Sequence, residues 1–181
     1  DPLDISTNAA VAVVAEAEAT ISMGAGASIR ASHDVSLLST STAWADVTTL
    51  RGAWGITYGN SSPTATITVA NGAVISAANN VEINAHADNK LNVLTFVPSL
   101  GESTNISVSL GIGRSTSLAD IHSGATVTAA SARVLAKNTN SFRNSAFATG
   151  FGTAKGKDSG FSATLALGFY QSSAKANVSG I

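Results

Sequence analysis

Apolar and polar residues alternate along most of the chain. In the segment 29–39, apolar or small side chains take every second position, beginning with Ile29 and Ala31, and polar residues such as Arg30 lie between them. A period of two over four to eight residues is typical of a β-strand with one buried face. No segment combines an apolar stripe of helical period with helix caps. We therefore predict an all-β chain.

A Gly-Ala pair opens a motif that occurs three times. Its copies begin at Gly26, Gly72 and Gly124, which are 46 and 52 residues apart. The first two copies align without a gap, and we align the third with one extra residue before its valine, Val134. The stretch 174–180 matches the residues that precede each copy. Self-similarity at such a period indicates a repeat architecture.

This repeat favours a β-solenoid. One coil cannot bury its inward face alone, so coils stack and share a narrow core. Small residues suit an interior in which opposed strands lie about 10 Å apart. We predict a single β-solenoid segment over residues 1–181, cut from a longer array, with irregular repeats of 46–56 residues that each wind about two coils. The connections 60–63, 98–105 and 150–160 are expected to be loops outside the solenoid.

Composition excludes several classes of protein. Only 12% of the residues are charged, about half the usual ~25%, which excludes a coiled coil and a basic nucleic-acid module. There is no cysteine, so disulfides and thiolate metal sites are excluded. The apolar runs are too short for a membrane helix. Residues 1–50 carry a net charge of about −5 and residues 130–181 about +5, which suggests attraction between opposite ends of neighbouring segments.

The three histidines do not suggest a metal site. His33, His86 and His122 fall at different positions of the repeat. Stacked coils would therefore not bring them together, as a shared metal ion requires. We predict no metal site and no cofactor, and the histidines are expected in turns or on the surface.

One acidic pair is a candidate for catalysis. Glu82 and Asp88, near Lys90, are the closest acidic pair in the middle of the chain. Paired carboxylates can hydrolyse glycosidic bonds. Because these two are six residues apart across an expected turn, we interpret them as solvated, and we predict no catalytic residues and no enzyme.

A candidate ligand-contact face comes from the repeat register. Each copy has a residue nine positions after an equivalent valine. These three residues are Trp44, Lys90 and Arg143. They are expected on one side of the solenoid, about two coils or 10 Å apart. An aromatic ring with two cations could bind an acidic or carbohydrate ligand. The alternative is that Trp44 covers one end of the core.

The motifs carry a family resemblance. The succession Ala-Val-Ala-Val, Ala-x-Ile and Gly-Ala-x-Ile-x-Ala-x-x-Asp-Val-x-Leu resembles repeats of very large secreted bacterial exoproteins, the filamentous-haemagglutinin-like and leukotoxin-type filamentous adhesins. The match runs over 9–47 and recurs at 67–87 and 121–136. The resemblance implies a right-handed parallel β-helix, an extracellular location at the bacterial surface, and a role as stalk or adhesive fibre. It also implies contact with a host or neighbouring cell, for which carbohydrate is a candidate ligand. The low charge and the short apolar runs predict neither nucleic-acid binding nor membrane insertion.

Other functions stay open at this point. A self-assembling filament or surface-layer subunit would join chains end to end through open coil edges. An ice-binding solenoid would need threonines in register, and the sequence 126–128 does not recur as threonine in the other copies. A solenoid that degrades polysaccharides would need clustered carboxylates. We prefer the adhesin stalk because it requires no catalytic cluster and tolerates irregular repeats.

Overall fold

The computed structural model describes residues 8–50, 54–99, 104–150 and 161–179. Within these residues the regular structure is all β, in three parallel sheets. Sheet A contains β1 (Asn8–Met23), β4 (Trp54–Val69), β7 (Thr104–Ile121) and β10 (Phe161–Val178). Sheet B contains β2 (Ser28–Ala31), β5 (Val74–Ala77) and β8 (Thr126–Thr128). Sheet C contains β3 (Val35–Leu50), β6 (Asn80–Ser99) and β9 (Ser131–Gly150).

Each repeat forms one coil, and the prediction of two coils per repeat is wrong. The chain passes through sheets A, B and C once before its next strand joins sheet A, so Asn8 pairs with Trp54 and Trp54 with Ile106. The strands of sheets A and C have 16–20 residues, far more than the four to eight expected for a short alternating strand. The residues of each repeat therefore form long strands and not a second coil. The stacked parallel coils are consistent with a β-solenoid.

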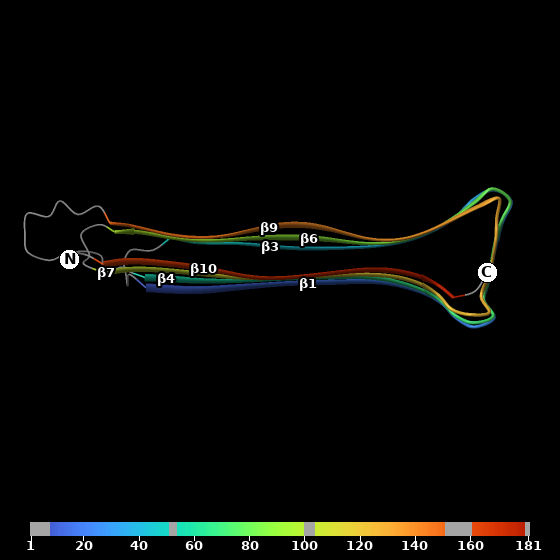
Figure 1. The fold of residues 1–181 in the computed structure, drawn as a ribbon, viewed down its shortest axis with the longest axis horizontal. Coiled ribbons are helices and arrows are strands. Elements are labelled where there is room, and N and C mark those ends of the chain that lie inside the picture. Colours follow the sequence, from blue (N-terminus) through green and yellow to red (C-terminus); the bar gives the residue numbers. More distant parts are fainter. Residues whose placement is uncertain (1–7, 51–53, 100–103, 151–160, 180–181) are drawn as a thin grey trace, which may run out of the picture.

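Sheets A and C form two long layers that face each other (Figure 1). At one end the layers diverge, and the short strands of sheet B close the gap between them. Successive coils overlap in this view, which is taken down the shortest axis of the molecule. The molecule is therefore longest along its strands and shortest along the stack.

The repeated Gly-Ala pair forms the turn between sheets A and B. Gly26, Gly72 and Gly124 have φ values of +73°, +76° and +80°. In the first turn the Ala27 N–H donates to the carbonyl oxygen of Gly24 at 3.1 Å, and the other two turns have the same bond. A positive φ at the third residue of such a turn favours glycine.

Equivalent residues of successive repeats lie over one another. Ile29 pairs with Ile75, and Ile75 pairs with Val127. Ile75 has 0% exposure and belongs to the apolar core cluster near sheet B. Each of these residues lies three positions after the glycine of its Gly-Ala motif, so the stacking that the repeat predicts is confirmed.

Further from sheet B, the interior contains polar side chains that bridge the two layers. Asn89 of β6 donates from Nδ2 to the carbonyl oxygens of Ser61 (3.1 Å) and Arg114 (2.7 Å). Asn138 of β9 donates to the carbonyl oxygens of Ser115 and Ser173. A buried amide is tolerated when it is hydrogen-bonded, so these side chains link sheets A and C directly.

The loop predicted at 60–63 is instead part of β4. Pro63 is buried on the inward side and pairs with Ala17 of β1. On its other side, pairing with β7 stops after Ser61 and resumes at Thr64, since proline has no N–H for a ladder bond. Of the other two predicted loops, Pro98 lies in β6 and Asn105 in β7, while residues 100–103 and 151–160 lie outside the described residues.

Candidate functional site

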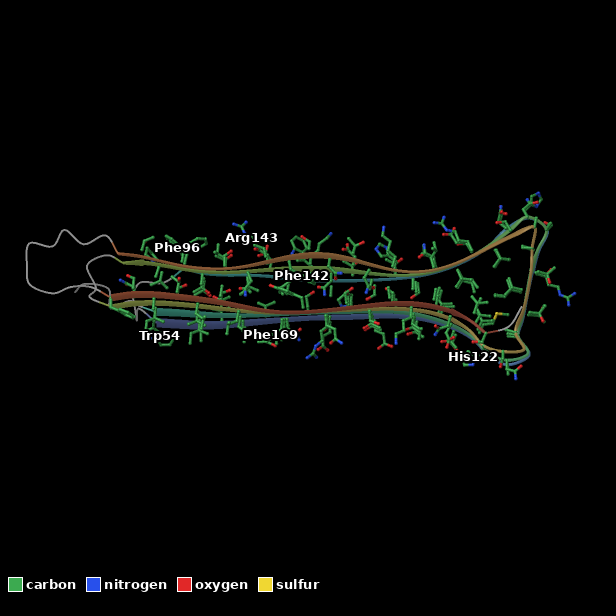
Figure 2. All side chains as sticks on the ribbon, in the orientation of Figure 1. Trp54, Phe96, His122, Phe142, Arg143 and Phe169 are labelled. Carbon is green, nitrogen blue, oxygen red and sulfur yellow. The ribbon has the colours of Figure 1, made fainter. Side chains whose placement is uncertain are left out.

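Trp44, Lys90 and Arg143 all lie on the outer face of sheet C, on β3, β6 and β9. Trp44 pairs in register with Lys90, as predicted. Arg143 is not in the same row, because Lys90 pairs with Ser141 and Arg143 pairs with Asn92. Arg143 points away from the layers, whereas its neighbour Phe142 points between them (Figure 2).

The shift has its origin at the corner between sheets B and C. Ser76 pairs with Thr128, 52 residues later, but Asn80 pairs with Ser131, 51 residues later. In the third copy of the repeat this corner is therefore one residue shorter than in the second copy, whereas the sequence alignment predicted one extra residue. Val134 consequently pairs with Ile83 in place of Val81. Counting nine residues from Val134 therefore gives a residue two positions beyond the partner of Lys90 on β9.

The three predicted residues nevertheless border one surface depression. It has a volume of about 250 Å³ and is open to solvent; its lining residues are Trp44, Lys90, Leu91, Asn92, Ser141 and Arg143. Their strands are adjacent, at the ~4.8 Å spacing of paired strands, so the predicted spacing of about 10 Å is wrong for Trp44 and Lys90. Trp44 is 66% exposed and stands outside the core, so it does not cover a core end.

Carboxylates accompany the cations of this depression. The Lys90 Nζ lies 3.3 Å from an Asp88 carboxylate oxygen. Asn92 donates to Asp46 Oδ1 at 2.8 Å, while the Asn92 Oδ1 is buried without a hydrogen-bond partner. Asp46 and Asn92 are not among the residues predicted from the sequence. Each follows a predicted residue by two positions, which in a strand places it on the same face.

This arrangement favours a ligand rich in hydroxyl groups over an anion. Asp88 neutralises Lys90, and Asp46 adds a second negative charge in the same row as Arg143, with Asn92 between them. The face offers an exposed indole ring, cationic donors and carboxylate acceptors. A sugar ring presents an apolar face for the indole and hydroxyl groups for these donors and acceptors.

The turn expected between Glu82 and Asp88 is not formed. Both lie on β6, which is continuous over Asn80–Ser99. Six residues of strand separate them by about 20 Å, beyond the ~5–9.5 Å of glycosidase carboxylate pairs. Each carboxylate instead contacts a neighbour two residues away, Asn84 for Glu82 and Lys90 for Asp88.

The histidines lie on three separate parts of the fold. His33 is in the corner before β3, where Ser32 Oγ lies 3.1 Å from its Nδ1. His86 of β6 contacts Thr139 Oγ1 at 3.0 Å, and His122 lies 3.3 Å from Asp120 in the turn after β7. Among the described residues, no group of three or more His, Cys, Asp or Glu side chains is placed to hold a metal ion.

Threonines do not form a continuous outer column. Thr126 pairs with Val74, which pairs with Ser28. On sheet A, Thr66 pairs with Leu118, and Thr68 pairs with Asp120. A flat array of threonines repeated on every coil is therefore absent from these positions.

The comparisons with known proteins add no family. No helix in the described residues is long and apolar enough to span a membrane. No family model, curated protein or solved structure matches this chain.

Proposed function

We propose that this chain is a structural and adhesive segment of a large secreted bacterial surface fibre and has no catalytic role. The observation that carries the proposal is the register: Ile29, Ile75 and Val127 lie over one another although 46 and 52 residues separate them. A stack of this kind lengthens by adding repeats, as a stalk requires. The resemblance of the repeats to filamentous adhesins supports the same function and an extracellular location.

We propose a right-handed winding for the coils. Connections between parallel strands of one sheet are right-handed in about 98% of cases, because the twist of the strands favours that hand. Each coil here connects parallel strands of sheet A through sheets B and C. The parallel β-helix implied by the resemblance has the same hand.

The adhesive contact is assigned to the depression at Trp44. Its ligand would be a carbohydrate of a host or neighbouring cell, bound by stacking on the indole and by hydrogen bonds to Arg143 and to the exposed Asp46 carboxylate. The exposure of Trp44, at 66%, supports this choice, because an exposed indole offers a large apolar surface to a sugar ring.

A binding assay with matched variants tests the contact. The purified chain would be applied to a glycan array and to intact cells, alongside Trp44→Ala and Leu38→Ala; Leu38 is likewise an exposed apolar residue of β3. We expect Trp44→Ala to weaken binding at least about tenfold, as loss of a central aromatic contact does, and Leu38→Ala to bind as the parent chain does. Equal binding by both variants would refute the assigned contact.

The stalk function needs a separate test, since a stalk need not bind glycans. Antibodies raised against the purified chain should label the surface of intact producing cells, and mild protease treatment should remove the label. Labelling that appears only after the cells are lysed would contradict the proposed location.

A further inference from the structure

Sheet A carries an apolar outer surface over the first halves of its strands. We call the apolar face the six residues that form two complete rows on β4, β7 and β10: Ile56, Tyr58, Val108, Leu110, Leu165 and Leu167. In the first row Ile56 pairs with Val108 and Val108 with Leu165. Trp54 and Phe169 extend the face on the same outer side (Figure 2), and Phe169 is 61% exposed.

The inner side of the same strand segments is small and polar. Gly55, Thr57 and Gly59 alternate with the apolar residues of β4 and are buried, and Ser107 and Ser109 do so on β7. Solvent-facing strand positions are ordinarily the polar ones. This reversal, together with the continuity of the apolar rows across three strands, marks a surface that another molecule covers.

The outer side of the first half of sheet A, with the apolar face at its centre, has the dimensions of a sheet-packing surface. From Phe161 to Phe169, β10 advances eight residues, or about 26 Å, and four strands at ~4.8 Å span about 19 Å. The flat area is thus about 500 Å². Two such faces in contact would bury about 1,000 Å² or more, which meets the lower limit for a specific interface. Apolar sheet faces pack on each other about 10 Å apart in sandwiches.

Charges beside the apolar face select the orientation of the partner. Glu16 and Glu18 are exposed on the outer side of β1, at one margin of sheet A. Arg114 of β7 and Lys175 of β10 are exposed on the outer side of the opposite half of the sheet. A second copy related by a two-fold axis parallel to the strands would place its β1 over β10 and its β4 over β7. Acidic and basic residues would then approach each other, and the apolar faces would meet.

We propose that two copies of this chain associate through sheet A about this axis, with the apolar faces in contact. A two-fold axis along the stacking direction also superimposes the apolar rows, but it puts β1 over β1 and leaves the acidic residues without basic partners. The charges therefore favour the axis parallel to the strands. Such pairing would join neighbouring fibres side by side, and it does not depend on the proposed glycan contact.

Sedimentation of the purified chain over a concentration series tests the association. We expect a monomer–dimer equilibrium, in which Ile56→Asp raises the dimer dissociation constant at least about tenfold because it buries an unpaired charge. Phe147→Asp is the matched control: Phe147 is also exposed, but on the outer face of sheet C, and this variant should dimerise normally. Circular dichroism must show that both variants are folded. A chain that stays monomeric throughout would refute the proposal.

Charge reversal tests the orientation. Glu16→Lys with Glu18→Lys should weaken dimerisation, and adding Arg114→Glu with Lys175→Glu should restore it, since the axis pairs these margins. Failure of the restoration would refute the axis.

Flotation with vesicles of neutral and anionic lipid tests whether the apolar face contacts lipid instead. If the chain is a monomer that floats with vesicles, and Ile56→Asp no longer floats, the face contacts lipid. The dimer proposal would then be wrong.

Discussion

The repeated glycine of the A–B turn illustrates what a single residue contributes. Gly26 has a φ of +73°, a conformation that costs a residue with a Cβ about 1–2 kcal/mol. A Cβ at this position would meet no heavy atom within 4 Å. The requirement for glycine here is therefore conformational and not steric.

Replacing this glycine should isolate the conformational cost. We expect Gly26→Ala to lower the free energy of unfolding by about 1 kcal/mol. Gly24→Ala, two residues earlier, is the control, because Gly24 also has no neighbour within 4 Å and its φ is not positive. Thermal unfolding of the two variants is the measurement. A loss of stability in Gly24→Ala that equals that in Gly26→Ala would contradict the interpretation.

Single residues also show where sequence reasoning succeeded and where it stopped. The alternation over 29–39 predicted strands, and the repeated Gly-Ala motif predicted stacked coils. The position of Arg143 was not predictable, because a corner one residue shorter leaves the apolar alternation intact and moves every later residue of β9 along its neighbour. Asn92 was missed because its role depends on what lies beside it on adjacent strands.

At the scale of elements, glycines in sheet A set how closely the two layers approach. Gly59, Gly111 and Gly168 pair in register on β4, β7 and β10. A Cβ added to Gly59 would lie 2.5 Å from Cγ2 of Val93 on β6. Side chains of sheet C therefore occupy the space that side chains of sheet A would otherwise fill.

Size complementarity between these strands can be measured by a double-mutant cycle. Gly59→Ala should cost about 1–3 kcal/mol by overpacking. In the Val93→Ala background the same change should cost at least about 0.5 kcal/mol less, since the colliding methyl groups are gone. Denaturant unfolding of the four proteins gives the coupling energy. Additive effects would indicate that the layers move apart freely at this point.

The lengths of the elements were less predictable than their type. Alternation gave the β class, but Asn60 and Pro63 suggested a loop where β4 continues. The inward serines and asparagines of the long strands form hydrogen bonds across the core, as Asn89 does with Ser61. Because such partners come from another sheet, a polar residue inside a strand cannot be distinguished from a loop residue in the sequence. This ambiguity led to the count of two coils per repeat.

For the whole molecule, stability depends on each coil being covered by its neighbours. The middle coil contains the most deeply buried positions, and Ile75 contacts the core with no exposed surface. At the equivalent position of the coils on either side, Ile29 and Val127 are only partly buried. A defect in the middle coil should therefore disrupt all three sheets.

An inward charge in this coil should prevent folding. Burial of an unpaired carboxylate at position 75 costs several kcal/mol, a large part of a typical domain stability of about 5–15 kcal/mol. We expect Ile75→Asp to abolish the cooperative unfolding transition. Ser76→Asp is the control, because Ser76 has the opposite orientation and lies beside Arg30. Native circular dichroism and melting in Ile75→Asp would contradict the inward register.

One coil per repeat also has a mechanical consequence. A strand of 18 residues is about 60 Å long, whereas each added coil extends the stack by only ~4.8 Å and the layers are about 10 Å apart. An array of many such coils would thus resemble a flat strap more than a round rod. Stiffness rises steeply with depth in the plane of bending, so the strap would flex readily across its thin dimension and resist flexing within its broad plane.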